Sequence, residues 1–336
     1  MSAMRGSSRR VFLKQCFTGA AVLRAGGAMG LRAAAQQGAA PEKSRVVVAR
    51  DDLLRGKGST VDSRRMLGLL DRAMQTLFDR DHAIEAWSRL VRPGETVGVK
   101  VNALGGRGLS SNLQLVEAIC ERLQQAGIKA GDIVVWDRDT DELERAGFRI
   151  AMGGNGVQCF GTDRVDYEPE LVAYGSVGSR LSIILTQRCS VLINVPVLKD
   201  HDGAGVTIAM KNMYGVIHNP NKYHPNGCNP YIADLNMLPE IRSRMRLTIC
   251  DATTAQYEGG PAYKPEYSWK QNALIVSRDP VALDYTGWQI IERKRAEKGL
   301  KTLEGEGRAP HYIATAADAG HRLGTNDPRR IAVIEV

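Results

Sequence analysis

No two cysteines of this chain lie close enough in sequence to form a metal-binding pair. The six cysteines are widely spaced, and no Cys-x-x-Cys sequence occurs. Ferredoxin-type iron–sulfur clusters and zinc ribbons need closely spaced thiolates, so the sequence predicts neither. Cys120 and Cys250 lie in apolar helical and strand patterns, which predicts that both are buried thiols.

Three motifs of familiar enzyme classes are also missing. The chain has no Gly-x-Ser-x-Gly, no Gly-x-Gly-x-x-Gly after a strand, and no Gly-x-x-x-x-Gly-Lys-Ser/Thr. These absences disfavour a serine hydrolase, a standard nucleotide-dependent dehydrogenase and a P-loop enzyme. Beyond the N-terminal segment no stretch is long and apolar enough to cross a bilayer, so we expect no membrane span in the mature protein.

The N-terminal segment carries the pattern of a twin-arginine export signal. Arg9 and Arg10 are followed at fixed spacing by Phe12-Leu13 and then by Lys14. This order is typical of an address that export machinery reads, not of an anchor. The weakly apolar stretch that follows is interrupted by Arg24, and a charge in mid-span disfavours a membrane helix.

A stretch of small residues, Ala33-Ala34-Ala35, then offers a cutting site for a signal peptidase. We therefore expect a signal peptide over residues 1–35, a flexible leader over residues 36–44 and a mature domain over residues 45–336. The expected partner is the twin-arginine (Tat) export machinery. The expected location is the periplasm, or another compartment reached by this pathway.

Most of the excess basic charge belongs to this segment. The whole chain has 45 basic and 37 acidic residues, a net charge of +8. The first 35 residues hold six of the basic ones and no acidic one, which leaves a net charge of +2 for the remainder. A balance this close to neutral gives no support for nucleic-acid binding.

Short apolar runs alternate with helical patterns after the leader. Because the runs are nearly continuous, they are typical of strands covered on both faces. We therefore predict an α/β fold, a mostly parallel sheet with helices on both faces, in a single large or bilobed domain. The predicted strands are Arg45–Arg50, Val97–Val101, Asp132–Trp136, Ser190–Val195, Arg246–Cys250, Ala273–Ser277 and Ile331–Glu335, with Leu181–Leu185 as a weaker candidate. The predicted helices are Ser63–Phe78, Ser111–Ala126, Gly205–Tyr214, Pro280–Arg293 and His311–Ala319.

Polar residues stand where several of these strands end. In open α/β sheets ligands bind outside the carboxyl ends of the strands, so these side chains are expected to converge on one crevice. The ordinary alternative is that polar residues simply begin loops and cap helices. The candidates for holding a substrate are Lys100, Asn102, Lys199, Gly205, Lys211 and Asn212, and those for catalysis are His201, Asp251 and Glu258.

The segment from Leu198 to Gly215 is the densest in such residues. We expect Lys199 and Lys211 to hold an anionic group, because their ammonium groups form charge-assisted hydrogen bonds. The predicted helix start at Gly205 would add backbone N–H donors. His201 is the expected proton-transfer group, since the pKa of an ordinary histidine lies near neutrality. A small anionic ligand is therefore the expected binding partner.

Three of the six histidines, His201, His218 and His224, fall within 24 residues and are candidate metal ligands. Their spacing fits no compact metal motif. The alternative is a polar loop in which a histidine contacts the substrate. The cofactor therefore stays unassigned, with a metal ion as one option.

Five segments of this chain resemble, in their order, the motifs of the DUF362 family. They are Val-Gly-Val-Lys100-Val-Asn102, Ile-Asn-Val-Pro196-Val-Leu-Lys199-Asp-His201, Met-Lys211-Asn212-Met-Tyr-Gly215, the Asp251 to Pro261 loop with Glu258-Gly-Gly-Pro, and Asp279-Pro-Val-Ala-Leu-Asp284. The resemblance runs from about Arg45 to the C-terminus. The activity of the family is essentially uncharacterised. Some members carry ferredoxin cysteines that this chain lacks.

Two functions of different classes fit these observations. The first is an enzyme with a polar crevice for an anionic substrate, assisted by a metal or another cofactor or by neither. The second is a binding protein for a small anionic ligand or a metal ion, without turnover. The acidic candidates Asp251 and Glu258 beside basic ones favour the enzyme, because binding an anion does not need them.

Overall fold

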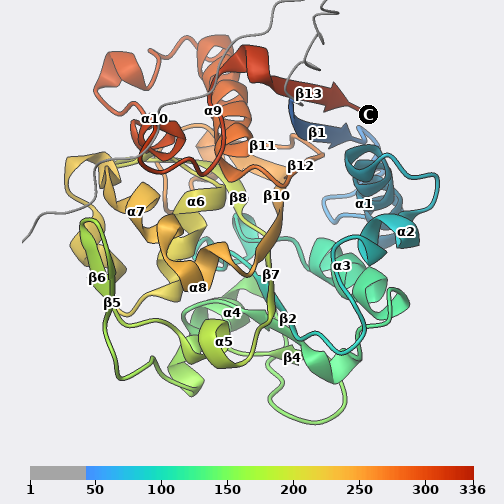
Figure 1. Cartoon of the computed structure of the whole chain (residues 1–336). Coiled ribbons are helices and arrows are strands. Elements are labelled where there is room, and N and C mark those ends of the chain that lie inside the picture. Colours follow the sequence, from blue (N-terminus) through green and yellow to red (C-terminus); the bar gives the residue numbers. More distant parts are fainter. Residues whose placement is uncertain (1–42) are drawn as a thin grey trace, which may run out of the picture. The chain divides into compact units, whose positions relative to one another are not determined.

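The apolar runs form one mixed sheet in the computed structural model of the protein, which describes residues 43–336 (Figure 1). Eight strands follow one another across it in the order β13-β1-β12-β10-β7-β2-β3-β4. Their bounds are β13 (Ile331–Glu335), β1 (Ser44–Arg50), β12 (Ala273–Ser277), β10 (Met245–Gln256), β7 (Val191–Asn194), β2 (Val97–Lys100), β3 (Ile133–Trp136) and β4 (Gln158–Cys159). Strand β12 is antiparallel to both of its neighbours, and the other pairs on this path are parallel. The prediction of a mostly parallel α/β sheet is confirmed.

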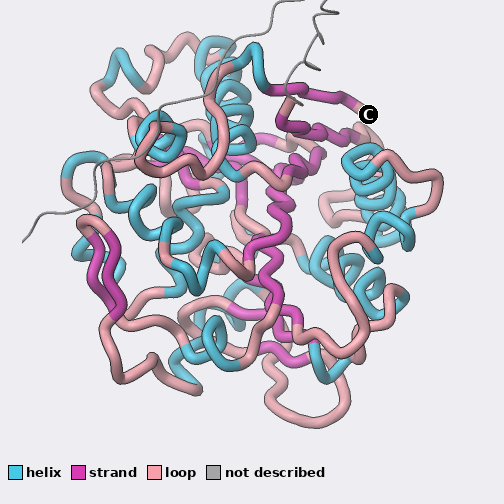
Figure 2. The backbone as a smooth tube through the Cα atoms, in the orientation of Figure 1, coloured by secondary structure: helices cyan, strands magenta, loops and turns pink. Residues whose placement is uncertain are grey.

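Helices cover both faces of this sheet, as the tube in Figure 2 also shows. Alternate strand residues point to opposite faces, so Ile133 and Val135 join one apolar core while Val134 and Trp136 join the other. The first core includes residues of α1 (Ser63–Phe78), α2 (Ala83–Ser88), α3 (Leu113–Gln125) and α4 (Thr140–Ala146). The second includes residues of α5 (Ile183–Gln187), α6 (Ala209–Asn212), α7 (Tyr231–Met237), α8 (Pro239–Arg242), α9 (Pro280–Glu297) and α10 (Tyr312–Ala317).

Side-chain caps explain where the longer helices begin. Asp62 accepts a hydrogen bond from the Arg65 amide at the start of α1, and Asp279 accepts from two amides at the start of α9. Helix α3 is capped by Asn112 and begins at Leu113, two residues after its predicted start at Ser111. An asparagine serves as well as a serine there, because its side-chain oxygen reaches the same free N–H groups.

Two of the predicted elements are wrong. The stretch predicted as a helix over residues 205–214 begins with β9 (Gly205–Thr207), which forms a hairpin with the preceding β8 (Val197–His201), and α6 starts only at Ala209. Gly205 has a φ of +78°, a backbone conformation that suits a tight turn and not a helix. The weaker strand candidate over residues 181–185 ends in α5 instead, because Ser182 caps a helical turn.

A third difference is the length of β10. The apolar run predicted a strand that ends at Cys250, but β10 continues to Gln256. Asp251 therefore lies in the middle of a strand and not at its carboxyl end. Here the chain tolerates a charged residue inside the sheet because Asp251 accepts hydrogen bonds from the amides of Asn112 and Thr253.

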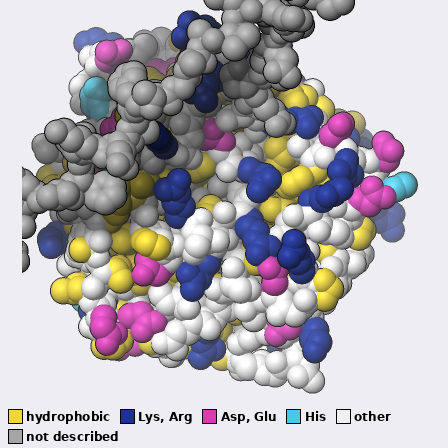
Figure 3. Space-filling view, in the orientation of Figure 1, with side chains coloured by type: hydrophobic (Ala, Val, Ile, Leu, Met, Phe, Trp, Pro, Cys, Tyr) yellow, Lys and Arg dark blue, Asp and Glu magenta, His cyan; other side chains and the backbone are white. Residues whose placement is uncertain are grey.

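The predicted signal peptide and nearly all of the predicted leader lie outside residues 43–336. Residues 43–336 lie within one compact unit. None of the helices in the described part of the chain is long and apolar enough to span a membrane. The five cysteines of this part are all buried and unpaired, so the predicted burial of Cys120 and Cys250 is confirmed. The face shown in Figure 3 carries basic side chains interspersed with acidic and apolar ones.

Candidate active site

The β8–β9 hairpin places three of the polar side chains on one of its faces. Lys199 lies opposite Thr207 in the ladder, and His201 lies opposite Gly205. Side chains two residues apart on a strand point the same way, as do directly paired ones. Lys199, His201 and Thr207 therefore share a face of the hairpin, and all three line a cleft of about 220 Å³.

The same cleft is reached from the carboxyl ends of β2 and β3 and from the turn that follows α6. Six of the nine substrate-binding and catalytic candidates line it, although they come from separate parts of the chain. These are Lys100, Asn102, Lys199, His201, Lys211 and Asn212. Further lining residues include Asp137, Arg138, Glu142, Thr207, Tyr214, Gly215, Pro220, Asn221, His224 and Pro261. Polar strand ends thus meet in one crevice, as the sheet topology requires.

A row of buried asparagines fixes α6 against the sheet. Asn102 donates through Nδ2 to Oδ1 of Asn212 at 3.0 Å, and Asn212 donates in turn to Oδ1 of Asn194 at 2.8 Å. Asn194 completes the row by donating to the carbonyl of Ala209 at 2.8 Å. Each buried amide is thereby satisfied, and the short helix that carries Lys211 is held at a defined distance from β2 and β7.

The amino end of α6 is capped from another helix. The carboxylate of Asp284, on α9, accepts hydrogen bonds from the amides of Ala209 at 2.7 Å and Met210 at 3.2 Å. Tyr312 donates its hydroxyl to the same carboxylate. Burial raises the pKa of Asp284 to about 7 despite these donors. The free N–H groups at this helix start are therefore bound to protein and do not reach a ligand.

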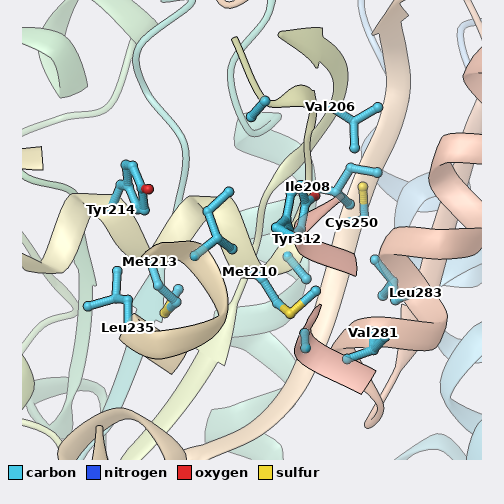
Figure 4. Close-up of a cluster of buried hydrophobic side chains, with 14 of the residues drawn as sticks. Val206, Ile208, Met210, Met213, Tyr214, Leu235, Cys250, Val281, Leu283 and Tyr312 are labelled. Atoms are coloured by element: carbon cyan, nitrogen blue, oxygen red, sulfur yellow. The ribbon is translucent and has the colours of Figure 1, made fainter. Parts of the chain in front are cut away.

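Apolar packing anchors the opposite side of α6. Figure 4 shows Met210 and Met213 among Leu235, Val281 and neighbouring side chains of one buried cluster. A well-packed core of this kind has no free volume in which the helix can shift. The position of Lys211 in the cleft is thus determined by packing as well as by hydrogen bonds.

Three lysines line the cleft, and the first of them, Lys100, is paired with a carboxylate. Lys100 Nζ lies 2.7 Å from Oδ1 of Asp137 and donates to the carbonyl of Val101 at 2.7 Å. Gly215 packs directly on this pair, since a Cβ there would lie 2.6 Å from Lys100 Nζ. Lys100 and Asp137 therefore form a closed ion pair in one wall of the cleft.

The other two lysines have no such partner. Lys199 is fully buried and Lys211 is 6% exposed, yet neither forms a salt bridge with any carboxylate in residues 43–336. Lys199 donates to Oδ1 of Asn102 at 3.1 Å and to the carbonyl of Pro261 at 3.2 Å. Burial without a counter-charge disfavours the ammonium form and lowers the pKa of each lysine to about 8.

The structure changes the expected role of His201. Its Nδ1 accepts hydrogen bonds from the amides of Gly203 at 3.0 Å and Ala204 at 3.1 Å, so in the neutral ring the proton is on Nε2. Burial, helped by the charges of Lys211 and other nearby basic groups, lowers the pKa of His201 to about 2. His201 is therefore a neutral hydrogen-bond donor and not a group that titrates near neutrality.

The two aspartates beside His201 do not reverse this effect. Asp202 lies 3.0 Å from Nδ1 of His201, but it is largely exposed and that nitrogen is already bound to two amides. Asp200 turns the other way, toward the amide of Gly260 and the guanidinium of Arg308. Burial thus outweighs the attraction of both carboxylates for a protonated ring.

A second histidine lies against Lys211. His224 Nε2 is 3.1 Å from Lys211 Nζ, and His224 Nδ1 is 3.1 Å from the carbonyl of Pro220. Because a carbonyl can only accept, Nδ1 carries the proton and Nε2 presents its lone pair to the lysine. The ring is fixed by stacking on His201, with centroids 5.6 Å apart, and by an edge contact with Tyr214.

Three of the nine candidates lie elsewhere. Asp251 is held inside β10, and Glu258 pairs with Arg295 and Arg308 on the other side of the loop that follows β10. Gly205 is in β9, where a side chain would collide with the backbone of Arg308, and it begins no helix. The expectation that all of the acidic and basic candidates share a cleft is therefore wrong for Asp251 and Glu258.

The three histidines do not form a metal centre together. His218 packs edge-on against the ring of Tyr167, away from the cleft that His201 and His224 line. Nδ1 of His201 is occupied by two amides, and Nε2 of His224 faces a lysine. Among residues 43–336 no group of three or more His, Cys, Asp or Glu side chains is arranged to hold an ion.

Sequence reasoning missed several residues that shape the cleft. Asn194 and Asp284 act through α6, and Glu142 and Tyr214 line the cleft itself. A polar residue at the end of an apolar strand, as Asn194 is, was the available signal. Asp284 lies 75 positions from its partner Ala209, and nothing local in the sequence indicates that pairing.

The fold and the cleft define an α/β protein with buried lysines in a polar cleft. Residues 97–289 match the family described as "Domain of unknown function (DUF362)". Because this match covers more than half of the chain, the protein belongs to the DUF362 family. The resemblance seen in the sequence motifs is thereby confirmed.

Solved structures show a more distant likeness. One is a crystal structure of a protein from Thermotoga maritima, 9% identical, with a TM-score of 0.42 over 72% of this chain and 60% of that one. Another is the lactate racemase apoprotein from Thermoanaerobacterium thermosaccharolyticum, 11% identical, with a TM-score of 0.41 over 71% of this chain and 58% of that one. The chain thus spans about three fifths of the length of these two proteins. No curated protein matches it.

Proposed function

We propose that this protein is an exported enzyme that binds a small anionic substrate in the cleft between the β8–β9 hairpin and α6. The observation that carries the proposal is the pair of buried lysines, Lys199 and Lys211, which line one cleft without a carboxylate partner. Burying a positive charge is costly unless a negative one accompanies it. An anionic group of the substrate would supply that charge.

The hydroxyl of Thr207 supports the same proposal. Thr207 is 5% exposed and lines the cleft, and its Oγ1 has no hydrogen-bond partner. Buried hydroxyl groups are normally satisfied, and an unsatisfied one lacks about 1–3 kcal/mol of hydrogen bonding. An oxygen of a bound carboxylate or phosphate would accept from Thr207 and from Lys199, which lies opposite it in the hairpin.

The lysines are also the groups best suited to move a proton. Each has a pKa lowered by burial to about 8, close to the range in which an acid or base is most effective near neutral pH. His201 supplies a fixed Nε2–H donor beside them. A neutral imidazole in this role can polarise a substrate oxygen without losing its own proton.

One observation favours the alternative, a binding protein without turnover. Asp251 and Glu258 do not reach the cleft, and Asp137 is engaged by Lys100. Glu142 is the carboxylate of the cleft that forms no ion pair within the described part of the chain, and burial raises the pKa of Glu142. The enzyme hypothesis therefore depends on the amines of Lys199 and Lys211 more than on carboxylates.

The test starts from protein purified from the exporting host. Native mass spectrometry should show a small anionic ligand that is lost on unfolding, and calorimetry should show binding of phosphate or of a small carboxylate. Lys199→Ala and Lys211→Ala should each weaken that binding at least tenfold, while the folded far-UV spectrum stays unchanged. Unaltered affinity in both variants would rule the anion site out. Binding without turnover of the identified ligand would favour the binding protein.

We also propose that the Tat machinery exports the folded protein to the periplasm. The support is the order of Arg9, Arg10, Phe12-Leu13 and Lys14, followed by a weakly apolar stretch and a run of alanines. Replacing Arg9 and Arg10 together by lysine should leave the precursor in the cytoplasm, since the receptor reads the paired arginines. An unchanged periplasmic yield of the double variant would refute export by this route.

A further inference from the structure

The side chain of Lys211 is arranged as an activated nucleophile. Its Nζ lies 3.1 Å from Nε2 of His224, and Nδ1 of His224 lies 3.1 Å from the carbonyl of Pro220. Nucleophile, base and a third group that orients the base are thus in line at hydrogen-bond distances. We infer that Lys211 forms an imine with the carbonyl carbon of a small aldehyde or ketone that also carries a carboxylate or phosphate group. This inference rests on the proposed anionic substrate and specifies its class.

The other two lysines of the cleft are less suited to this step. Lys100 Nζ is already bound to the carboxylate of Asp137 and to the carbonyl of Val101, so it is not free to attack a carbonyl carbon. Lys199 donates to two oxygens, Oδ1 of Asn102 and the carbonyl of Pro261, and both favour the protonated form. Lys211 instead faces a nitrogen lone pair, which can accept its proton.

The surroundings of Lys211 divide the site into two ends. At one end are Lys199 Nζ, the free hydroxyl of Thr207 and Nε2–H of His201, on one face of the β8–β9 hairpin. They are three donors for the oxygens of an anionic group. At the other end Lys211 and His224 act on the carbonyl carbon. Lys211 and Lys199 share one cleft, and burial lowers the pKa of Lys211 to about 8, which favours its neutral, nucleophilic amine.

The proposed step balances without any further reactant. The neutral amine of Lys211 attacks the carbonyl carbon, and its two protons pass in turn, through Nε2 of His224, to the former carbonyl oxygen. The first transfer gives a carbinolamine, and the second lets that oxygen leave as water when the C=N bond forms. Hydrolysis reverses the sequence and restores the lysine. No electrons are gained or lost, so no oxidant or reductant is needed until the trapping experiment below supplies one.

Reductive trapping tests the inference. The purified exported protein is mixed with glyoxylate, the smallest such oxo acid, and sodium cyanoborohydride, which reduces an imine to a stable secondary amine. Intact-mass analysis should show one adduct formed much faster than those on surface lysines, and peptide mapping should place it on Lys211. Excess acetate, which has the carboxylate but no reactive carbonyl, should slow trapping by competing for the anionic end.

Two variants separate the chemical role from the binding role. Lys211→Arg keeps the positive charge but forms no stable imine, so it should still bind glyoxylate in calorimetry and give no rapid adduct. His224→Gln keeps a polar side chain but removes the base, so the rate of trapping should fall at least tenfold while the adduct stays on Lys211. Trapping of Lys211→Arg at the wild-type rate, or mapping of the adduct to Lys199, would overturn the assignment.

The result also separates this inference from the proposed function. If glyoxylate or acetate binds in calorimetry but wild-type protein gives no rapid adduct, imine formation is refuted and the anion site stands. If neither acid nor phosphate binds, the anion site itself is refuted. A rapid adduct on Lys211 that acetate does not slow would support the nucleophile and refute the anionic end assigned to Lys199.

Discussion

Two clusters of buried or partly buried basic side chains contact opposite faces of the β8–β9 hairpin, and they differ in whether carboxylates accompany the positive charges. In the arginine cluster, Arg308 contacts Asp200 at 3.3 Å, Glu258 at 2.8 Å and Glu306 at 2.6 Å, and Arg295 pairs with the same two glutamates. In the lysine cleft, Lys199 and Lys211 contact neutral oxygens and nitrogens.

Under the proposed function, this difference separates a cluster that stabilises the fold from a cluster that binds a ligand. A buried charge with its partners in place holds chain segments together, and removing one partner leaves the others uncompensated. A buried charge without a partner lowers stability in the free protein and is offset only when an ion arrives. Sequence reasoning placed Glu258 in the functional site because it could not distinguish these two cases.

The largest expected effect is a loss of stability when the arginine cluster is disrupted. Arg308→Met should lower the free energy of unfolding by roughly 3–5 kcal/mol, because it leaves the buried carboxylate of Asp200 without its ion pair. Urea unfolding followed by circular dichroism measures the change. The matched control is Arg329→Met, whose ion pair with Asp327 is exposed and screened by solvent, so its stability should stay close to that of the wild type. Equal effects in the two variants would remove the distinction between the clusters.

Replacing a lysine of the cleft by methionine should change the free energy of unfolding less than Arg308→Met does, and in the opposite direction. Lys211→Met removes a buried, unpaired charge, and the flexible apolar side chain of methionine fills a similar space. We expect the ligand-free variant to be as stable as the wild type or up to about 1 kcal/mol more stable, and to have lost anion binding. A loss as large as that of Arg308→Met would mean that Lys211 has a structural partner in solution.

The third test is a dependence of stability on pH. The pKa of Lys211 is lowered from 10.5 to about 8 in the folded protein. The unfolded chain therefore binds more protons between these two values, and this lysine makes a contribution to stability that rises with pH from about 8 to about 10.5. The gap in stability between Lys211→Met and the wild type should narrow over this range. Saturating phosphate should suppress the narrowing, and an identical pH profile for both proteins would contradict it.

The parts of the structure that follow from local pattern were predictable. Ser63–Phe78 has a regular apolar stripe, and α1 has these same bounds. Val97–Val101 and the polar residues Lys100 and Asn102 also indicated a strand that ends in a ligand crevice, because that rule depends only on strand direction.

The parts that depend on distant partners were not predictable. Asp251 resembles a strand-end acid until the amide of Asn112, 139 positions away, is seen to bind it. The contact of Lys211 with His224 depends on the path of the loop over residues 218–230, which contains several prolines and asparagines and follows no period. The helical reading of residues 205–214 failed because the pairing of β9 with β8 outweighed the local preference of the segment.

The parallel pairing of β1 with β13 affects when the sheet can be completed during translation. Val46 lies opposite Val333, so the first strand of the sheet is covered on one side by a strand synthesised almost three hundred residues later. During translation that side of β1 stays open, and open strand edges are where nascent chains associate wrongly. The sheet is closed on that side only after residues 331–335 have been added.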